Sequence, residues 1–202
     1  MERAGLVNKV KIKLDEFTPD GVDLPFDDYI GPMLDESAKD ILEQAPLHLI
    51  IPEEIPTSAI KYQNDLVYIP VPDNYIRLYE IKFPSWKKSI REAISQSHPM
   101  YEIQENEYTK SGLGRPSVVL KYEKVDNIPG RWLVCGKVSD VGSPTPSIAL
   151  YVRELLPEQL SDHFADALTW LAASKIFQIE GLISQAEMAL AQYKLSLQNK
   201  SI

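Results

Sequence analysis

Near both ends of the chain, apolar residues recur every three or four positions, which is the spacing of one face of an α-helix. In the last fifty residues one such stripe covers 160–179 and a second covers 183–197, with Gly181 between them. Pro157 suits a first helical turn. The sequence therefore predicts two helices, or one kinked helix, over about 157–198.

Two further helices are predicted in the first 45 residues. Leu6, Val10 and Leu14 form a helical stripe, although the lysines between them also fit a strand, and we favour the helix. Apolar positions within 29–45 predict a second amphipathic helix, which the following proline ends. The acidic, turn-rich segment 18–28 between these two helices is predicted to be a loop.

The middle of the chain is rich in β-branched and aromatic residues and is punctuated by prolines, which is typical of short strands. Segment 86–96 fits either a short helix or an amphipathic strand. Two of the predicted strands flank Ile128-Pro129-Gly130 and are expected to form a hairpin. The predicted strands cover residues 66–69, 76–83, 117–125, 131–138 and 147–153.

This order of elements predicts an α+β fold, a helical bundle from the N- and C-terminal helices with a central β-rich insert. We expect residues 1–59 and 153–202 to form the bundle and residues 60–152 to form the insert.

The charge is unevenly distributed along the 202 residues. The chain has 21 lysines and arginines and 29 aspartates and glutamates, a formal net charge of −8. Residues 1–60 carry a net charge of −8, residues 61–152 of +2 and residues 153–202 of −2. An acidic total argues against tight sequence-independent DNA binding, which needs clustered lysine and arginine.

Several further classes of protein are not expected. No apolar run is long enough for a membrane span, and the charged N-terminus does not fit a signal peptide. The single cysteine indicates a reducing compartment. The sequence contains no nucleotide-binding P-loop, and the aspartates of the acidic loop do not have the spacing of an EF-hand calcium site.

No catalytic or metal-binding constellation is recognisable. The three histidines, His48, His98 and His163, lie far apart in the sequence, and we expect His48 to be partly buried. Cys135 lies in the middle of a predicted strand and is expected in the core. The pair Gly112 and Gly114 is expected to form a turn, because a strand rather than a helix follows it. We therefore predict no catalytic residues, no metal, no cofactor and no enzymatic activity.

One cluster suggests contact with nucleic acid. Lysine, arginine and aromatic side chains interleave at Tyr79, Trp86, Lys87, Lys88 and Arg91, as in surfaces that bind phosphates and stack on bases. A solvated face on which the lysine stems cover the tryptophan explains the same residues, and we favour it.

A series of short motifs resembles a known family. The first is VPDNYIRL at Val71–Leu78, which enters a predicted strand, and Trp86 follows it. In the order of its segments, the chain resembles the head-to-tail adaptor, or neck ring, proteins of tailed bacteriophages, including the tail tubular proteins of short-tailed phages. Its proline-rich style is similar to that of the crAss-like group. The remaining motifs are Pro99, Tyr101, Gln104 and Asn106, then Gly112, Gly114 and Pro116, then the alanine-rich helices of 165–198.

The resemblance implies a virion structural protein, made in the cytoplasm of the host bacterium. It implies a closed homo-oligomeric ring of about twelve copies that docks on the portal protein, meets the next tail proteins and surrounds the DNA channel without a membrane partner. In this family the portal contact lies in the C-terminal helical tail. An acidic wall of the DNA channel would let DNA slide past it. Carried to this sequence, the partner contacts are Leu190, Tyr193 and Leu197, and the channel-facing residues are Asp23, Asp27 and Asp28.

Two other classes of function remain open at this point. One is a soluble, non-enzymatic protein-interaction module that acts as a monomer or dimer. The other is an enzyme whose site is built from carboxylates that no motif identifies.

Overall fold

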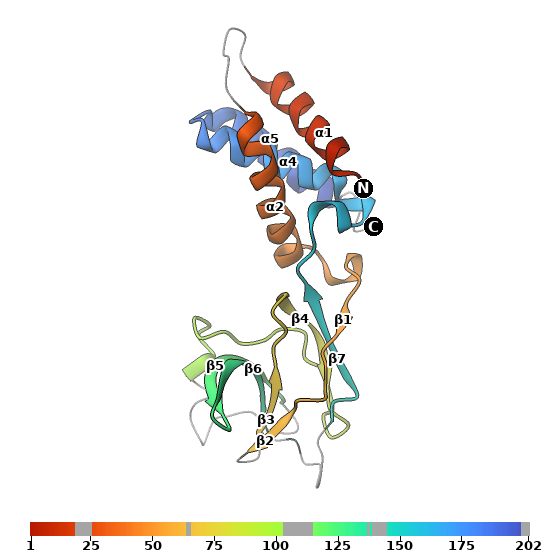
Figure 1. Ribbon diagram of the computed structural model, residues 1–202, viewed down its shortest axis with the longest axis vertical. Coiled ribbons are helices and arrows are strands. Elements are labelled where there is room, and N and C mark those ends of the chain that lie inside the picture. Colours follow the sequence, from red (N-terminus) through yellow and green to blue (C-terminus); the bar gives the residue numbers. More distant parts are fainter. Residues whose placement is uncertain (19–25, 64–65, 103–114, 137, 139–144, 199–202) are drawn as a thin grey trace. The chain divides into compact units, whose positions relative to one another are not determined.

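Both ends of the chain fold into α-helices, and strands lie between them, in a computed structural model (Figure 1). The chain divides into a helical unit, Met1–Ile50 with Glu154–Ile202, and a strand-rich unit, Ile51–Arg153. Helices together with antiparallel sheets confirm the predicted α+β class. The structure describes residues 1–18, 26–63, 66–102, 115–136, 138 and 145–198.

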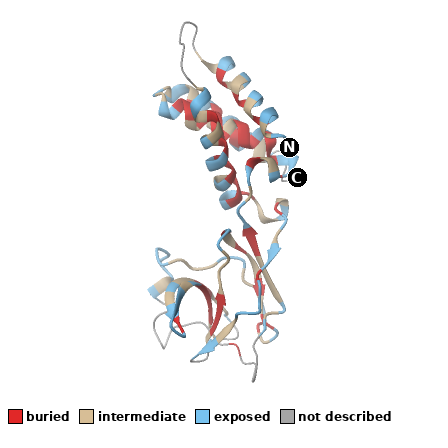
Figure 2. Ribbon diagram, viewed as in Figure 1, coloured by how far each residue is buried: buried red, intermediate tan, exposed pale blue. Residues whose placement is uncertain are grey.

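The helical unit is built around α4, which α1, α2 and α5 all contact. Ten of the 15 residues of α4 are buried, as expected for a helix that is apolar on most sides (Figure 2). By contrast, α1 buries a single stripe, Leu6, Val10 and Leu14, so the helix that we favoured there is confirmed. The described α-helices are α1 (Arg3–Phe17), α2 (Asp27–Gln44), α4 (Ala165–Ile179) and α5 (Ile183–Gln198).

Gly181 separates α4 from α5 and confirms the prediction of two C-terminal helices. Its φ of +74° lies in the left-handed region, where glycine ends helices without a steric penalty. The expected start at residue 157 is wrong, because Leu160 and Ser161 have extended backbones that interrupt the helix. Two short 3-10 turns, η2 (Pro157–Gln159) and η3 (Asp162–Phe164), occupy that stretch instead. A third such turn, η1, covers Leu47–Leu49.

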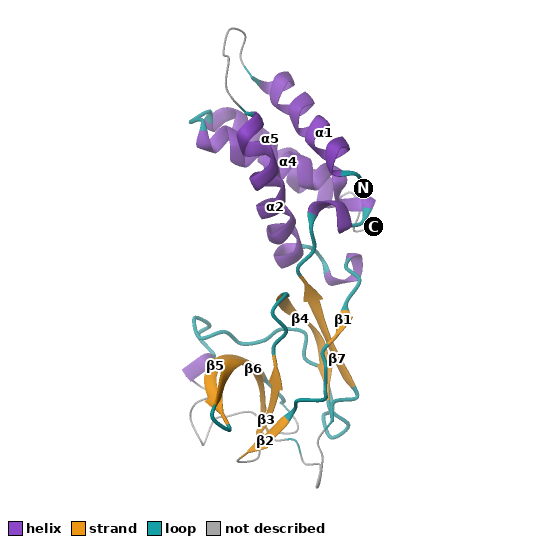
Figure 3. Cartoon of the chain, viewed as in Figure 1, coloured by secondary structure: helices purple, strands orange, loops and turns teal. Residues whose placement is uncertain are grey.

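The strand-rich unit contains two antiparallel sheets (Figure 3). The first has the order β1-β7-β4 and the second the order β2-β3-β6-β5. Each of the five predicted strands exists, although β3 and β4, which are consecutive in the sequence, belong to different sheets. The strands are β1 (Glu53–Glu54), β2 (Lys61–Gln63), β3 (Leu66–Pro70), β4 (Tyr75–Lys82), β5 (Val118–Val125), β6 (Ile128–Gly136) and β7 (Ile148–Arg153).

Side chains from both sheets share one core. Val67 of β3 and Leu133 of β6 belong to the same buried cluster as Leu78 of β4 and Tyr151 of β7. The alternate residues Tyr68, Trp132 and Val134 point to the other face of their sheet and form a second, smaller cluster with Val125. The strand-rich unit therefore has its own hydrophobic core, as an independently folding unit requires.

Strands β5 and β6 form the predicted hairpin, but its turn lies earlier than expected. Asp126 and Asn127 connect the strands with φ angles of 49° and 65°, the left-handed conformation that two-residue hairpin turns need and that Asp and Asn tolerate. Ile128, Pro129 and Gly130, which we predicted as the turn, are already part of β6. The Pro-Gly pair was therefore the wrong turn signal.

Two smaller differences concern the start and the interior of the insert. Glu53 and Glu54, expected with the helices, pair with Tyr151 and Leu150 of β7, so residues 51–59 lie in the strand-rich unit. Segment 86–96 is neither a helix nor a regular strand. Among the described residues, no helix is long and apolar enough to cross a membrane.

Candidate functional site

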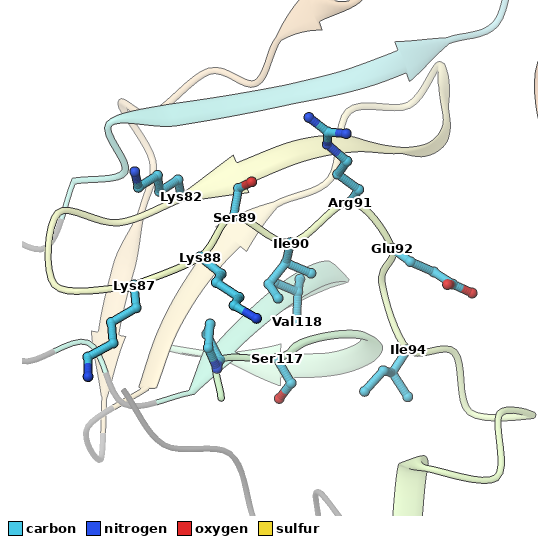
Figure 4. A pocket seen from close by; sticks show the side chains of 11 residues that line it. Lys82, Lys87, Lys88, Ser89, Ile90, Arg91, Glu92, Ile94, Ser117 and Val118 are labelled. Carbon is cyan, nitrogen blue, oxygen red and sulfur yellow. The ribbon is translucent and has the colours of Figure 1, made fainter. Parts of the chain in front are cut away.

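A basic groove of about 760 Å³ lies on the strand-rich unit (Figure 4). One wall is the segment that follows β4, and the other is the start of β5. Pro84 lies two residues after the end of β4 and has no backbone N–H to donate to a sheet. The groove is lined by Lys82, Lys87, Lys88, Ser89, Ile90, Arg91, Glu92, Ile94, Pro116, Ser117 and Val118.

Backbone hydrogen bonds hold the first wall in place. Ile90 and Ile81 of β4 exchange two backbone bonds, of 2.9 and 2.8 Å. Four residues later, Ile94 donates to Val118 and accepts from Leu120, at 2.8 and 2.9 Å, so the segment also pairs with β5. Since β4 and β5 are the outer strands of different sheets, this segment links the two sheets and keeps its side chains over a fixed surface.

The positive charge of the groove is largely uncompensated. Among the basic residues of the groove, Arg91 forms an ion pair with Glu80 at 3.3 Å. Lys82, Lys87 and Lys88 have no ion pair among the residues that the structure describes. In Figure 4 these lysine side chains extend to one side of Ile90, whereas the carboxylate of Glu92 extends to the other. The lysine side of the groove is therefore suited to an anion.

The aromatic part of the cluster that we identified in the sequence does not belong to this surface. Trp86 is only 2% exposed and packs against Phe83 with ring centroids 4.9 Å apart, so it is a core residue. Tyr79 is half-buried and does not line the groove. Because neither ring is available for stacking, the surface offers charge but no platform for a base.

The C-terminal helix presents a different surface. Of the three residues expected to contact a partner, Tyr193 is buried in the helical unit, and Leu190 and Leu197 are half-buried at the edge of the same face. The hydroxyl of Tyr193 has no hydrogen-bond partner among the described residues. Burial and the nearby Asp40 carboxylate raise the pKa of this phenol. Tyr193 in particular packs within its own chain.

The outward face of α5 carries other apolar residues. Met188 is 48% exposed and Leu195 is 49% exposed, and Ala191 between them is also exposed. Their spacing of three and four residues places them in one stripe, opposite the buried Ala186 and Tyr193. The sequence shows this stripe as a second apolar series on the same helix. The longer series, which includes Leu190, Tyr193 and Leu197, is the stronger signal.

Two of the aspartates expected to face a channel lie at the start of α2. Asp27 and Asp28 occupy its first turn, where a carboxylate interacts favourably with the positive end of the helix dipole. Asp27 is an exposed residue that pairs with Lys11 of α1 at 2.8 Å. Asp23 lies outside the described residues. The negative charge of Asp27 is thus partly neutralised within its own unit.

The remaining candidates show no reactive arrangement. Burial raises the pKa of the Cys135 thiol, and the residue lies in the core as predicted. His48, His98 and His163 are exposed, so the expected partial burial of His48 is wrong. Within the described part of the chain, no group of three or more His, Cys, Asp or Glu side chains could hold a metal ion. Gln104, Asn106, Gly112 and Gly114 lie outside that part.

No protein-family model matches the sequence, and no curated protein is similar to it.

Proposed function

We propose that this protein is a virion structural protein of a tailed bacteriophage, a subunit of the head-to-tail connector, or neck, ring that docks on the portal and surrounds the DNA channel. The proposal rests on the resemblance of the sequence motifs and on the order of elements, helices at both ends and a β-rich insert between them. Such a subunit acts through its surfaces and needs no active site.

The observation that carries the proposal is the exposed apolar stripe Met188, Ala191 and Leu195 on α5. A helix of an isolated chain usually presents polar residues to water, and an exposed apolar stripe marks a contact surface. We assign the portal or neighbour contact to this stripe, whereas Leu190 and Leu197 lie at the edge of the opposite, buried face and Tyr193 packs internally. About twelve copies would close such a ring by head-to-tail contacts.

Native mass spectrometry and negative-stain imaging test the proposal. The protein is examined at high concentration, alone and with the portal protein from the same genome. We expect a closed ring of about twelve subunits with a hole wider than duplex DNA. A stable dimer that does not bind the portal protein would overturn the proposal and favour an interaction module instead.

A pair of variants tests the contact surface. Met188→Gln with Leu195→Gln keeps good helix formers and replaces the stripe by polar side chains, so we expect loss of the ring or of portal binding with unchanged folding. Ile12→Gln on α1 is the matched control, because Ile12 is 64% exposed in the same unit and lies outside the stripe. An equal loss in both variants would show that α5 has no special role.

A further inference from the structure

The lysine side of the basic groove is a concentration of positive charge in an acidic protein. Residues 81–91 contain three lysines and one arginine and no aspartate or glutamate, although the whole chain has a net charge of −8. Lys87 and Lys88 are exposed, and Lys82 is half-buried. Like charges on one surface repel one another, and no carboxylate among the described residues relieves the three lysines through an ion pair. An anion bound in the groove would remove this repulsion.

The shape and lining of the groove indicate which kind of anion fits. A single nucleotide would gain little, because Trp86 is buried and no other aromatic ring of the described residues lines the groove for stacking. Lysine ammonium groups bind phosphate oxygens as point charges, so separate lysines can meet successive phosphates without the planar bidentate geometry that arginine offers to carboxylates and phosphates alike. The one arginine here, Arg91, is already beside Glu80. Ser89 adds a hydroxyl group to the lining.

We infer that this groove binds the phosphodiester backbone of nucleic acid, through Lys82, Lys87 and Lys88 and without reading the bases. Successive phosphates of one strand reach the separate ammonium groups, and the apolar side chain of Ile90 lies beside them (Figure 4). Such contacts are independent of sequence and sensitive to salt. With three lysines the binding of one chain is weak, and several copies on one nucleic acid would strengthen it.

This binding goes beyond the proposed ring, and its test uses the single chain. The affinity for a fluorescent 30-base-pair duplex of mixed sequence is measured by anisotropy at several salt concentrations from about 20 mM upward. Three contacted phosphates predict a log–log slope of about −2.7 against salt. Lys87→Glu with Lys88→Glu should raise the Kd at least tenfold and reduce the slope by about 1.8. Lys87→Arg with Lys88→Arg should keep both values near those of the parent.

The control is Lys39→Glu with Lys194→Glu, which changes the net charge equally but alters exposed lysines of the helical unit. This variant should change the Kd less than threefold. Equal weakening by both double variants would show that only net charge matters and would overturn the inference. Absence of duplex binding by the parent chain at the lowest salt would also overturn it. If polyglutamate of matched charge bound as tightly as the duplex, the groove would fit an acidic protein, and this result would also overturn the inference.

Discussion

At the scale of single residues, Lys13 of α1 is in an unusual environment. Its ammonium group donates to Thr169 Oγ1 at 2.6 Å and lies 4.2 Å from the centre of the Trp170 ring. Burial lowers the pKa of Lys13 from 10.5 to about 8, and the more distant Asp166 opposes this only in part. The folded protein therefore binds this proton less tightly than the unfolded chain does.

This difference predicts a pH dependence of stability. Between pH 8 and 10.5 the unfolded chain keeps the Lys13 proton while the folded protein loses it, so this residue's contribution to stability rises with pH in that window and is constant below it. Lys13→Met removes the effect. We expect the urea midpoint of the parent to rise relative to that of Lys13→Met from pH 8 to 10. A difference that is the same at every pH would contradict the assignment.

Glycine positions with opposite backbone requirements give a second prediction. Gly181→Ala should destabilise the protein by about 1–2 kcal/mol, because its φ of +74° is strained for any residue with a Cβ, although no atom lies within 4 Å of that position. Gly5→Ala in α1 meets no neighbour either, but its backbone is helical, so it should stabilise by about 0.5–1 kcal/mol. Denaturant unfolding of both variants measures the two free energies, and changes of the same sign would refute the argument.

At the scale of elements, close packing of α5 on α4 explains which face is buried. Ser174 of α4 donates a buried hydrogen bond of 2.8 Å to the backbone oxygen of Ala186. A side chain as short as serine reaches a neighbouring backbone only where the helices approach closely, and the small Ala186 and Ala189 permit this approach. The larger Leu190 and Leu197 are displaced to the edge of the contact.

Tyr193 tests this arrangement. Tyr193→Phe should leave the stability unchanged or raise it, because the buried hydroxyl has no partner among the described residues and its removal leaves no new unsatisfied group. Tyr193→Ala should cost about 3–5 kcal/mol through the cavity it creates. Leu195→Ala, on the exposed face, should change the free energy of unfolding by less than about 0.5 kcal/mol. If Tyr193→Ala were as mild as Leu195→Ala in urea unfolding, Tyr193 would not be a core residue.

At the scale of the whole molecule, the chain passes from one unit to the other through neighbouring strands. Glu53 of β1 lies opposite Tyr151 of β7, so the fragment 51–153 begins and ends on paired strands around its own core. We expect this fragment to fold alone, with dispersed amide NMR signals and a cooperative urea transition. Collapsed NMR signals and a gradual transition would show that its core needs the helices.

The sequence by itself determined the α+β class, the helices at both ends and every long strand. Those elements depend on the spacing of apolar residues, which every window of the chain displays locally. The sequence also indicated the basic residues within 87–91, because the positions of charged side chains are read directly from it.

Only the tertiary structure decided which surfaces exist. Trp86 next to these lysines is buried and not exposed, because the segment 84–94 is drawn over the core by its bonds to β4 and β5. Met188 and Leu195 of α5 face water, because the small residues on the opposite side of this helix let it pack closely on α4. Ser117, which directly precedes β5, joins the groove from a segment distant in the sequence. Contacts between distant segments leave no periodic signal, so burial and side-chain assembly at a site follow from packing and not from local pattern.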